Sequence, residues 1–198
     1  MPVVVPIVEG HGEVEAVREL VRRIAEAGHP GLVPVVRAPI RVKSGSFVHD
    51  EGYLAKHVRL AAAKAAQEDG IVLILLDCED DCPGRLGPAL LAQAQAVRDD
   101  VAYIVAVAYR EYETWFLAAA ASLRGCAGLP QDLVPPPDPE AIRGAKEWLS
   151  KRMSEGYDPI QHQASLTAQF DLDSAASVPS FRRLRARLTG YFETCLSG

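Results

Sequence analysis

Acidic residues follow three of the predicted strands, where their carboxylates could bind a divalent cation. They are Glu9 and Glu13 after the first strand, Asp77, Glu79, Asp80 and Asp81 after the third, and Glu111 and Glu113 after the fourth. Like charges gathered at one edge repel each other, so an uncompensated cluster lowers stability. Mg²⁺ removes this repulsion, because it takes oxygen ligands from a few carboxylates together with water and substrate phosphates. Two such ions about 4 Å apart would form a site that hydrolyses phosphodiesters.

Each acid taken singly is better explained as a solvated loop residue. Acids at three separate strand ends in one chain favour a metal site instead. The segment 77–113 holds eight acidic and three basic residues, so this segment alone accounts for the net charge of −5 that the whole chain carries. We therefore expect Mg²⁺ or Mn²⁺ at this edge.

Strand and helix patterns alternate through the first half of the chain. Apolar runs at 3–8, 71–76 and 101–108 are typical of strands buried on both faces. The remaining elements are a short strand at 32–36 and helices at 14–24, 54–68 and 86–97. This order predicts an α/β fold, a three-layer unit with a mostly parallel four-stranded sheet whose site lies beyond the carboxyl ends of the strands. Pro6 lacks an N–H to donate, which an edge or bulge position would tolerate.

The second half of the chain is polar and its patterns are helical. Residues 113–123 could form a helix, and the run Pro-Pro-Pro-Asp-Pro at 135–139 predicts a stiff linker. Helix-like pieces follow around 142–154, 162–170 and 181–195. We therefore predict two regions, an α/β core over residues 1–123 and a C-terminal helical extension over residues 124–198. The extension could pack on the core or be partly separate.

Composition excludes several classes of protein. The chain has 198 residues, of which 48% are hydrophobic and 24% charged, so it is neither disordered nor collagenous. Its net charge of −5 excludes a general basic coat for nucleic acid but permits a local basic patch. No apolar run approaches the ~20 residues that cross a bilayer, and the start of the chain lacks the basic region of a signal peptide. Four cysteines form no disulfide framework, so we expect a cytoplasmic protein without membrane contact.

The glycines after the first strand do not complete a nucleotide-binding motif. Gly10 and Gly12 match the start of GxGxxG, but Glu15 stands at the third glycine position. Arg37, rather than an acidic residue, follows the second predicted strand, and the chain contains no GxxxxGK[ST]. We therefore expect no dinucleotide site, and we interpret these glycines as allowing a tight turn beside the acids.

Two segments resemble a known class of nuclease domain. Val8-Glu9-Gly10-His11-Gly12-Glu13 resembles the VEGxxE signature of Toprim domains, notably those of overcoming-lysogenization-defect (OLD) nucleases. Leu76-Asp77-Cys78-Glu79 resembles their DxD or DxE strand end. Over nearly the whole chain, the spacing of these acids and of the segments 111–116, 162–164 and 180–184 resembles a bacterial domain-of-unknown-function family related to Toprim. That family is typically encoded beside an ATPase of the SMC/RecF-like AAA type.

The resemblance implies a Toprim-like core and a Mg²⁺-dependent site. Glu9 would be a metal ligand or general base, Glu13 would assist a second metal, and Asp77 and Glu79 would bind metal. Candidate catalytic residues are Glu9, Asp77 and Glu79, and candidate metal ligands are Glu9, Glu13, Asp77, Glu79, Asp81, Glu111 and Glu113. Topoisomerase-type members usually have Asp at the position of Glu79, and no Tyr of this chain lies in a recognisable strand-passing domain, so topoisomerase activity is not expected.

Two functions follow from this resemblance. The first is a nuclease or phosphodiester hydrolase that acts on nucleic acid, DNA rather than RNA, with an SMC/RecF-like ATPase as its partner. The alternative is the same fold used as a non-catalytic docking or regulatory subunit of an ATPase complex. Divalent-dependent cleavage that is lost on changing Glu9 would separate the two.

Basic residues near the end of the chain could contact phosphates. Four arginines lie between residues 182 and 187, and Arg182 and Arg185 share one helix face. Arginine binds phosphates bidentately, and release of counterions favours such binding. The candidate nucleic-acid contacts are Arg41, Lys43, Arg182 and Arg185. A solvated amphipathic helix explains the same pattern.

Cys78, Cys82 and His162 have no settled role. Two cysteines at this spacing would need two more ligands to hold zinc, so ordinary thiols are the simpler interpretation and a disulfide the minor one. His162 would be a surface or cap residue, unless the extension folds over the site and uses it as a general acid or phosphate contact.

Overall fold

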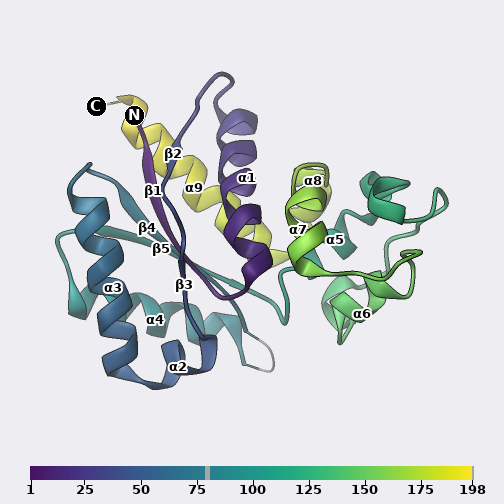
Figure 1. The fold of residues 1–198 in the computed structure, drawn as a ribbon. Helices are drawn as coiled ribbons and strands as arrows, with labels where there is room; N and C mark the ends of the chain where they lie inside the picture. Colours follow the sequence, from purple (N-terminus) through teal and green to yellow (C-terminus); the bar gives the residue numbers. More distant parts are fainter. Residues whose placement is uncertain (79–80, 198) are drawn as a thin grey trace.

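The computed structural model describes residues 1–78 and 81–197 and confirms an α/β fold with a parallel sheet (Figure 1). The sheet is built on β1 (Val3–Val8), β4 (Ile71–Asp77) and β5 (Ala102–Ala108), in the strand order β2-β1-β4-β5. The second predicted strand, 32–36, is reduced to β2 (Val35–Val36), and an additional short strand, β3 (Ile40–Arg41), follows it; both pair with β1. All pairings between the described strands are parallel, so their carboxyl ends lie at one edge.

Helices cover both faces of this sheet, as Figure 1 shows. Alternate side chains of each long strand point to opposite faces. Val4, Leu73 and Ile104 pack in one cluster with α1 (His11–Gly28) and α9 (Pro179–Ser197). Val5 and Val72 pack in the other cluster with α3 (Glu51–Ala66) and α4 (Pro83–Val97). Burial of both faces explains why these strands are almost wholly apolar.

Two local expectations need correction. Pro6 lies in an inner strand, paired opposite Leu73 of β4, and not at an edge. The carbonyls of Val4 and Val8 accept hydrogen bonds from the β2–β3 side, so the backbone of Pro6 also faces that side. Its missing N–H therefore falls at the gap between β2 and β3, where no ladder bond is lost. The loop expected over residues 37–50 contains β3 and the short helix α2 (Ser44–His49).

The helical extension packs against the core. Its last helix, α9, covers one face of the sheet. Before α9 the extension contains α6 (Ala145–Ser150), α7 (Pro159–Thr167) and α8 (Leu172–Ala175), with 3-10 turns at Cys126–Gly128 and Pro139–Ala141. They are preceded, at the end of residues 1–123, by α5 (Thr114–Ala118) and the 3-10 turn Ala120–Leu123. In Figure 1 these helices lie to one side of the sheet, with α7 against α1. One hydrophobic cluster runs from the strands through Trp115, Phe116, Phe170 and Phe181 to α9. No helix in the described part of the chain is long and apolar enough to cross a membrane.

Close contact between α1 and α7 explains Gly12. A Cβ built at this position would lie 2.5 Å from the carbonyl oxygen of Pro159 and would also meet Oε1 of Gln163. Only glycine lets the two helix ends approach this closely. From the sequence, Gly12 is expected to allow a tight turn. In the structure, glycine is required at this position because α7 of the extension packs directly against it.

Candidate functional site

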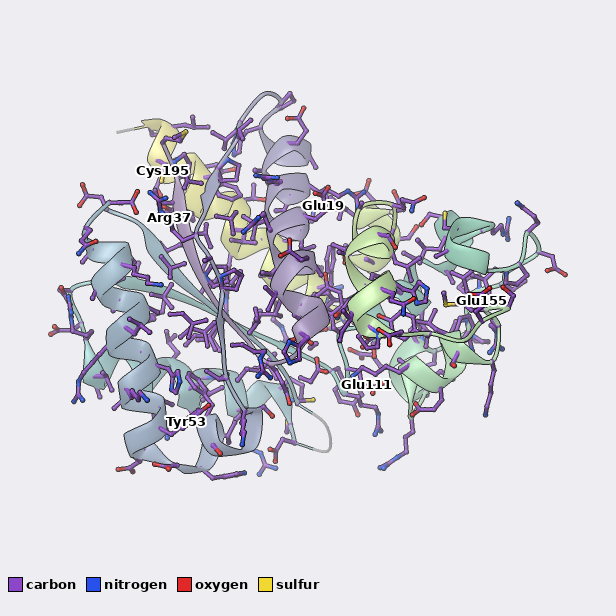
Figure 2. The ribbon with its side chains drawn as sticks, in the orientation of Figure 1. Glu19, Arg37, Tyr53, Glu111, Glu155 and Cys195 are labelled. Atoms are coloured by element: carbon purple, nitrogen blue, oxygen red, sulfur yellow. The ribbon has the colours of Figure 1, made fainter. Side chains whose placement is uncertain are left out.

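A pocket of about 360 Å³ lies at the carboxyl edge of the sheet. The turn after β1 lines it with Glu9 and Glu13, β4 with Asp77, and the segment after β5 with Glu111. The extension closes the pocket with Lys146 of α6 and the start of α7. The structure therefore brings together acids from three strand ends, as the parallel order predicts. Figure 2 shows Glu111 at the boundary between the sheet and the extension.

Asp77 ends β4 in the interior of this cluster. Its Oδ1 accepts a hydrogen bond of 2.8 Å from the backbone N–H of Tyr112, which fixes the carboxylate. Burial, followed by repulsion from Glu13 and Glu113, raises the pKa of Asp77 well above its usual range. The ammonium of Lys146 opposes this shift. Positive charge beside Asp77 therefore favours its ionised form.

Lys146 supplies such a charge. Its Nζ lies 3.3 Å from Oε1 of Glu111, 3.6 Å from Oε2 of Glu113 and 3.7 Å from Oδ2 of Asp77. The backbone N–H of Lys146 also donates to Oε2 of Glu111, at 3.2 Å. Burial on its own would lower the pKa of Lys146, but attraction to the surrounding carboxylates outweighs it and the pKa is raised. Lys146 therefore remains charged and holds three strand-end acids together.

Glu113 lies behind Lys146 and is completely buried. The hydroxyl of Tyr157 donates a hydrogen bond of 2.8 Å to its Oε1. Burial raises the pKa of Glu113 to about 7, although Lys146 and Tyr157 both favour the charged form. Glu113 does not line the pocket. It affects the charge of the cluster through its contact with Lys146, on the buried side of that residue.

Glu13 has a structural role within the same turn. Its Oε2 accepts hydrogen bonds from the backbone N–H of Glu9, at 3.0 Å, and of Gly10, at 2.5 Å. This is the reciprocal half of a capping arrangement at the start of α1. The carboxylate therefore fixes the turn that carries Glu9, and only its remaining oxygen is open to another ligand.

The other predicted acids lie elsewhere or cannot be placed. Asp81 is exposed and lines a separate hollow with Cys82 and Arg85. Glu79 and Asp80 lie outside the described residues. Of the predicted metal ligands in the described part of the chain, Glu9, Asp77 and Glu111 share the pocket with Glu13.

The donor chemistry of this cluster fits a hard divalent cation, but its spacing fits an ammonium. Within residues 1–78 and 81–197, no three Asp, Glu, His or Cys side chains stand close enough to hold a metal ion. Mg²⁺ binds oxygen at about 2.1 Å, whereas the carboxylates surround Nζ of Lys146 at 3.3 to 3.7 Å. The carboxylates that surround the Lys146 ammonium are suitable ligands for Mg²⁺. They would have to move closer together to bind Mg²⁺, because its distances to oxygen are shorter.

The predicted nucleic-acid contacts are scattered. Arg41 and Lys43 are exposed at β3 and the start of α2. Arg182 is exposed at the start of α9, where it donates to the carbonyl of Ala176. Arg185 forms an ion pair of 2.5 Å with Asp173, so part of its charge is already used within the protein.

Cys78 and His162 have local partners. Sγ of Cys78 accepts a hydrogen bond of 3.1 Å from the backbone N–H of Arg110, and neither Cys78 nor Cys82 forms a disulfide. Nδ1 of His162 accepts from the backbone N–H of Asp158, at 2.9 Å, which places it at the start of α7 as a cap residue. Neither residue lines the acidic pocket.

Sequence reasoning missed Lys146 and Tyr157. Lys146 lies in a polar helical stretch that looks like surface, and Tyr157 is 44 positions from Glu113, the acid to which it donates. Their roles depend on the return of the extension over the strand ends, which no local pattern encodes. The one signal available was the excess of acids at 77–113, which requires a compensating positive charge from some other part of the chain.

Comparisons with known proteins give one match. The model of the family described as "Domain of unknown function (DUF4276)" matches residues 8–189. That span contains Glu9, Asp77, Glu111 and Lys146, so both regions that build the pocket belong to it. We found no match among curated proteins or among solved structures.

Proposed function

The chain belongs to the DUF4276 family, and from its pocket we propose that it is a Mg²⁺- or Mn²⁺-dependent, Toprim-like phosphodiester hydrolase that acts on nucleic acid. One observation carries the proposal, namely that three parallel strand ends deliver Glu9, Asp77 and Glu111 to a single pocket. The likeness of residues 8–13 and 76–79 to Toprim motifs supports it independently.

Glu9 and Asp77 would hold the metal, with Glu111 beside them and Glu79 added by the Toprim likeness. When bound, the metal supplies charge for the phosphate oxygens and lowers the pKa of a bound water. The pKa of Asp77 supports this assignment, because burial and then repulsion from Glu13 and Glu113 raise it, and a cation bound beside Asp77 would favour its charged form.

The chain's own residues prepare the pocket for an anionic substrate. The backbone N–H of Tyr112 keeps the carboxylate of Asp77 in one orientation. Lys146 and Arg110 line the same pocket and offer positive charge to a phosphate. Glu13 fixes the turn that presents Glu9. The start of α7 covers one side, so a substrate must enter between the core and the extension.

Cleavage of plasmid DNA tests this proposal. Wild-type protein with Mg²⁺ or Mn²⁺ should nick the plasmid, and EDTA should stop it. Asp77→Asn should lower the rate at least about 100-fold, because it removes a ligand charge. Asp132→Asn is the matched control, since Asp132 is exposed on the extension and lies outside the pocket. Equal rates for Asp77→Asn and wild type would refute the assignment.

A non-catalytic docking or regulatory subunit of an SMC/RecF-like ATPase complex is the second candidate. One observation favours it, because Lys146 already compensates the acids without a metal. This candidate requires that no divalent cation supports cleavage. It also requires that the protein forms a stable complex with the co-encoded ATPase, and that Asp77→Asn leaves this complex intact. The hydrolase would work with the same kind of ATPase, so complex formation alone does not decide between the two.

A further inference from the structure

We propose that the free edge of β5 docks an extended acidic segment of a partner protein, which pairs with the sheet as an additional parallel or antiparallel strand. A groove of about 330 Å³ runs along this edge between α4 and α9. It shares no lining residue with the acidic pocket, so the proposal does not depend on the proposed activity.

The floor of the groove is an unpaired strand edge. β5 pairs with β4 on one side, and no other described strand pairs with it. Ala108 accepts a hydrogen bond through its carbonyl from Cys78, so it faces β4. Backbone groups alternate in direction along a strand, so those of Val105 and Val107 face the groove. Such an edge is a template for an added strand.

One of these edge groups already has a side-chain partner. Nη1 of Arg187 donates a hydrogen bond of 2.7 Å to the carbonyl oxygen of Val105. Arg187 is otherwise exposed and can turn toward a ligand. It therefore covers part of the edge in the free protein, and an incoming strand would take its place and leave the guanidinium free to bind an acid.

The residues on the two sides of the groove favour a strand with both acidic and apolar side chains. Pro88 and Leu91 of α4 form an apolar wall on one side. On the other side, α9 presents Arg183 and Arg187, and none of the described residues that line the groove is acidic. Residues four apart on a helix are about 6 Å apart, and alternate residues of a strand are about 7 Å apart. Two acids at alternate positions would therefore match both arginines, while the residue between them faces the apolar wall.

The same features disfavour other occupants. A second copy of this chain would bring two further arginines against Arg183 and Arg187, and like charges repel. A nucleic-acid strand would satisfy the arginines, but it has no peptide N–H or carbonyl in its backbone to continue the sheet. Acidic polypeptide uses all three features of the groove.

Peptide binding to the full chain tests the proposal. The probe is a labelled heptapeptide of alternating Glu and Val, and the control probe replaces each Glu by Lys. The acidic peptide should bind at least about tenfold more tightly than the basic one, and Arg183→Glu combined with Arg187→Glu should remove this preference. Arg182→Glu is the matched control for Arg183→Glu alone, which should also weaken binding, since it makes the same charge change on α9 outside the groove. Arg183→Gln alone should weaken binding if the double variant does not fold.

Amide exchange measured by NMR tests strand pairing itself. Bound peptide should slow exchange at Val105 and Val107, and should leave Ala106, which faces β4, unchanged. Several results would overturn the proposal: no binding at millimolar peptide, equal weakening by Arg182→Glu, or binding without protection of Val105 and Val107. Displacement of the peptide by single-stranded DNA would assign the groove to nucleic acid, and a β5-dependent dimer at micromolar protein would assign it to a second copy.

Discussion

Replacing Glu113 with Gln should make the stability of the protein less dependent on pH. Glu113 is completely buried, and its pKa is raised from 4.5 to about 7. Because the folded state binds this proton more tightly than the unfolded state does, protonation favours folding. That contribution is fully present below about pH 4.5 and is lost as the pH rises through 7. Gln carries no charge at either pH and can still accept from Tyr157.

The magnitude follows from the shift in pKa. A change from 4.5 to about 7 corresponds to about 3 kcal/mol of unfolding free energy at high pH. Part of the loss already occurs below pH 5. Between about pH 5 and pH 8.5, wild type should therefore lose roughly 2 to 3 kcal/mol that Glu113→Gln retains. Solvent does not screen this carboxylate, because the side chain has no exposed surface.

Urea unfolding at these two pH values, in EDTA, measures the difference. The free energy of Glu113→Gln minus that of wild type should rise with pH. Glu155→Gln is the control, since Glu155 lies exposed on the extension (Figure 2) and its loss should change stability by less than about 0.5 kcal/mol at both values. A difference for Glu113→Gln that stays constant with pH would refute the assigned cause of the shift.

Three further predictions concern the cluster, the α1–α7 contact and the basic helix. Lys146→Met in EDTA should lower the free energy of unfolding by about 1 to 3 kcal/mol, since solvent screens part of the charge of a side chain that is 36% exposed. Millimolar Mg²⁺ should raise the melting temperature of this variant more than that of wild type. Gly12→Ala should cost about 1 to 3 kcal/mol in urea unfolding, because its Cβ meets Gln163, whereas Gly45→Ala, with open space around it, should not destabilise. Arg182→Glu should weaken DNA binding at low salt and reduce the slope of log K against log salt by about 0.9, and an unchanged slope would exclude a phosphate contact.

The acidic edge could be predicted because its information is local. Buried apolar runs end at Glu9, Asp77 and close to Glu111, and the parallel arrangement of alternating strands and helices places these ends at one edge. No pairing between distant residues had to be guessed for that step. The fold class and the outline of the site followed from the same runs.

Features that depend on the return of the extension could not be predicted. Lys146 compensates Asp77 from 69 positions further along the chain, and its own helix shows only a polar surface pattern. β3 is a two-residue strand, too short for any periodic pattern to reveal. The amphipathic pattern of α9 identified a basic face, but it pointed to Arg182 and Arg185, whereas the groove receives Arg183 and Arg187.

Metal binding at the strand ends is the central claim, and a Mn²⁺ soak of crystals tests it most directly. The proposed function predicts an anomalous peak in the acidic pocket, within about 2.3 Å of carboxylate oxygens of Glu9 and Asp77, with Nζ of Lys146 displaced from its present position. A pocket without such a peak at saturating Mn²⁺, with Lys146 still between Asp77, Glu111 and Glu113, would contradict it.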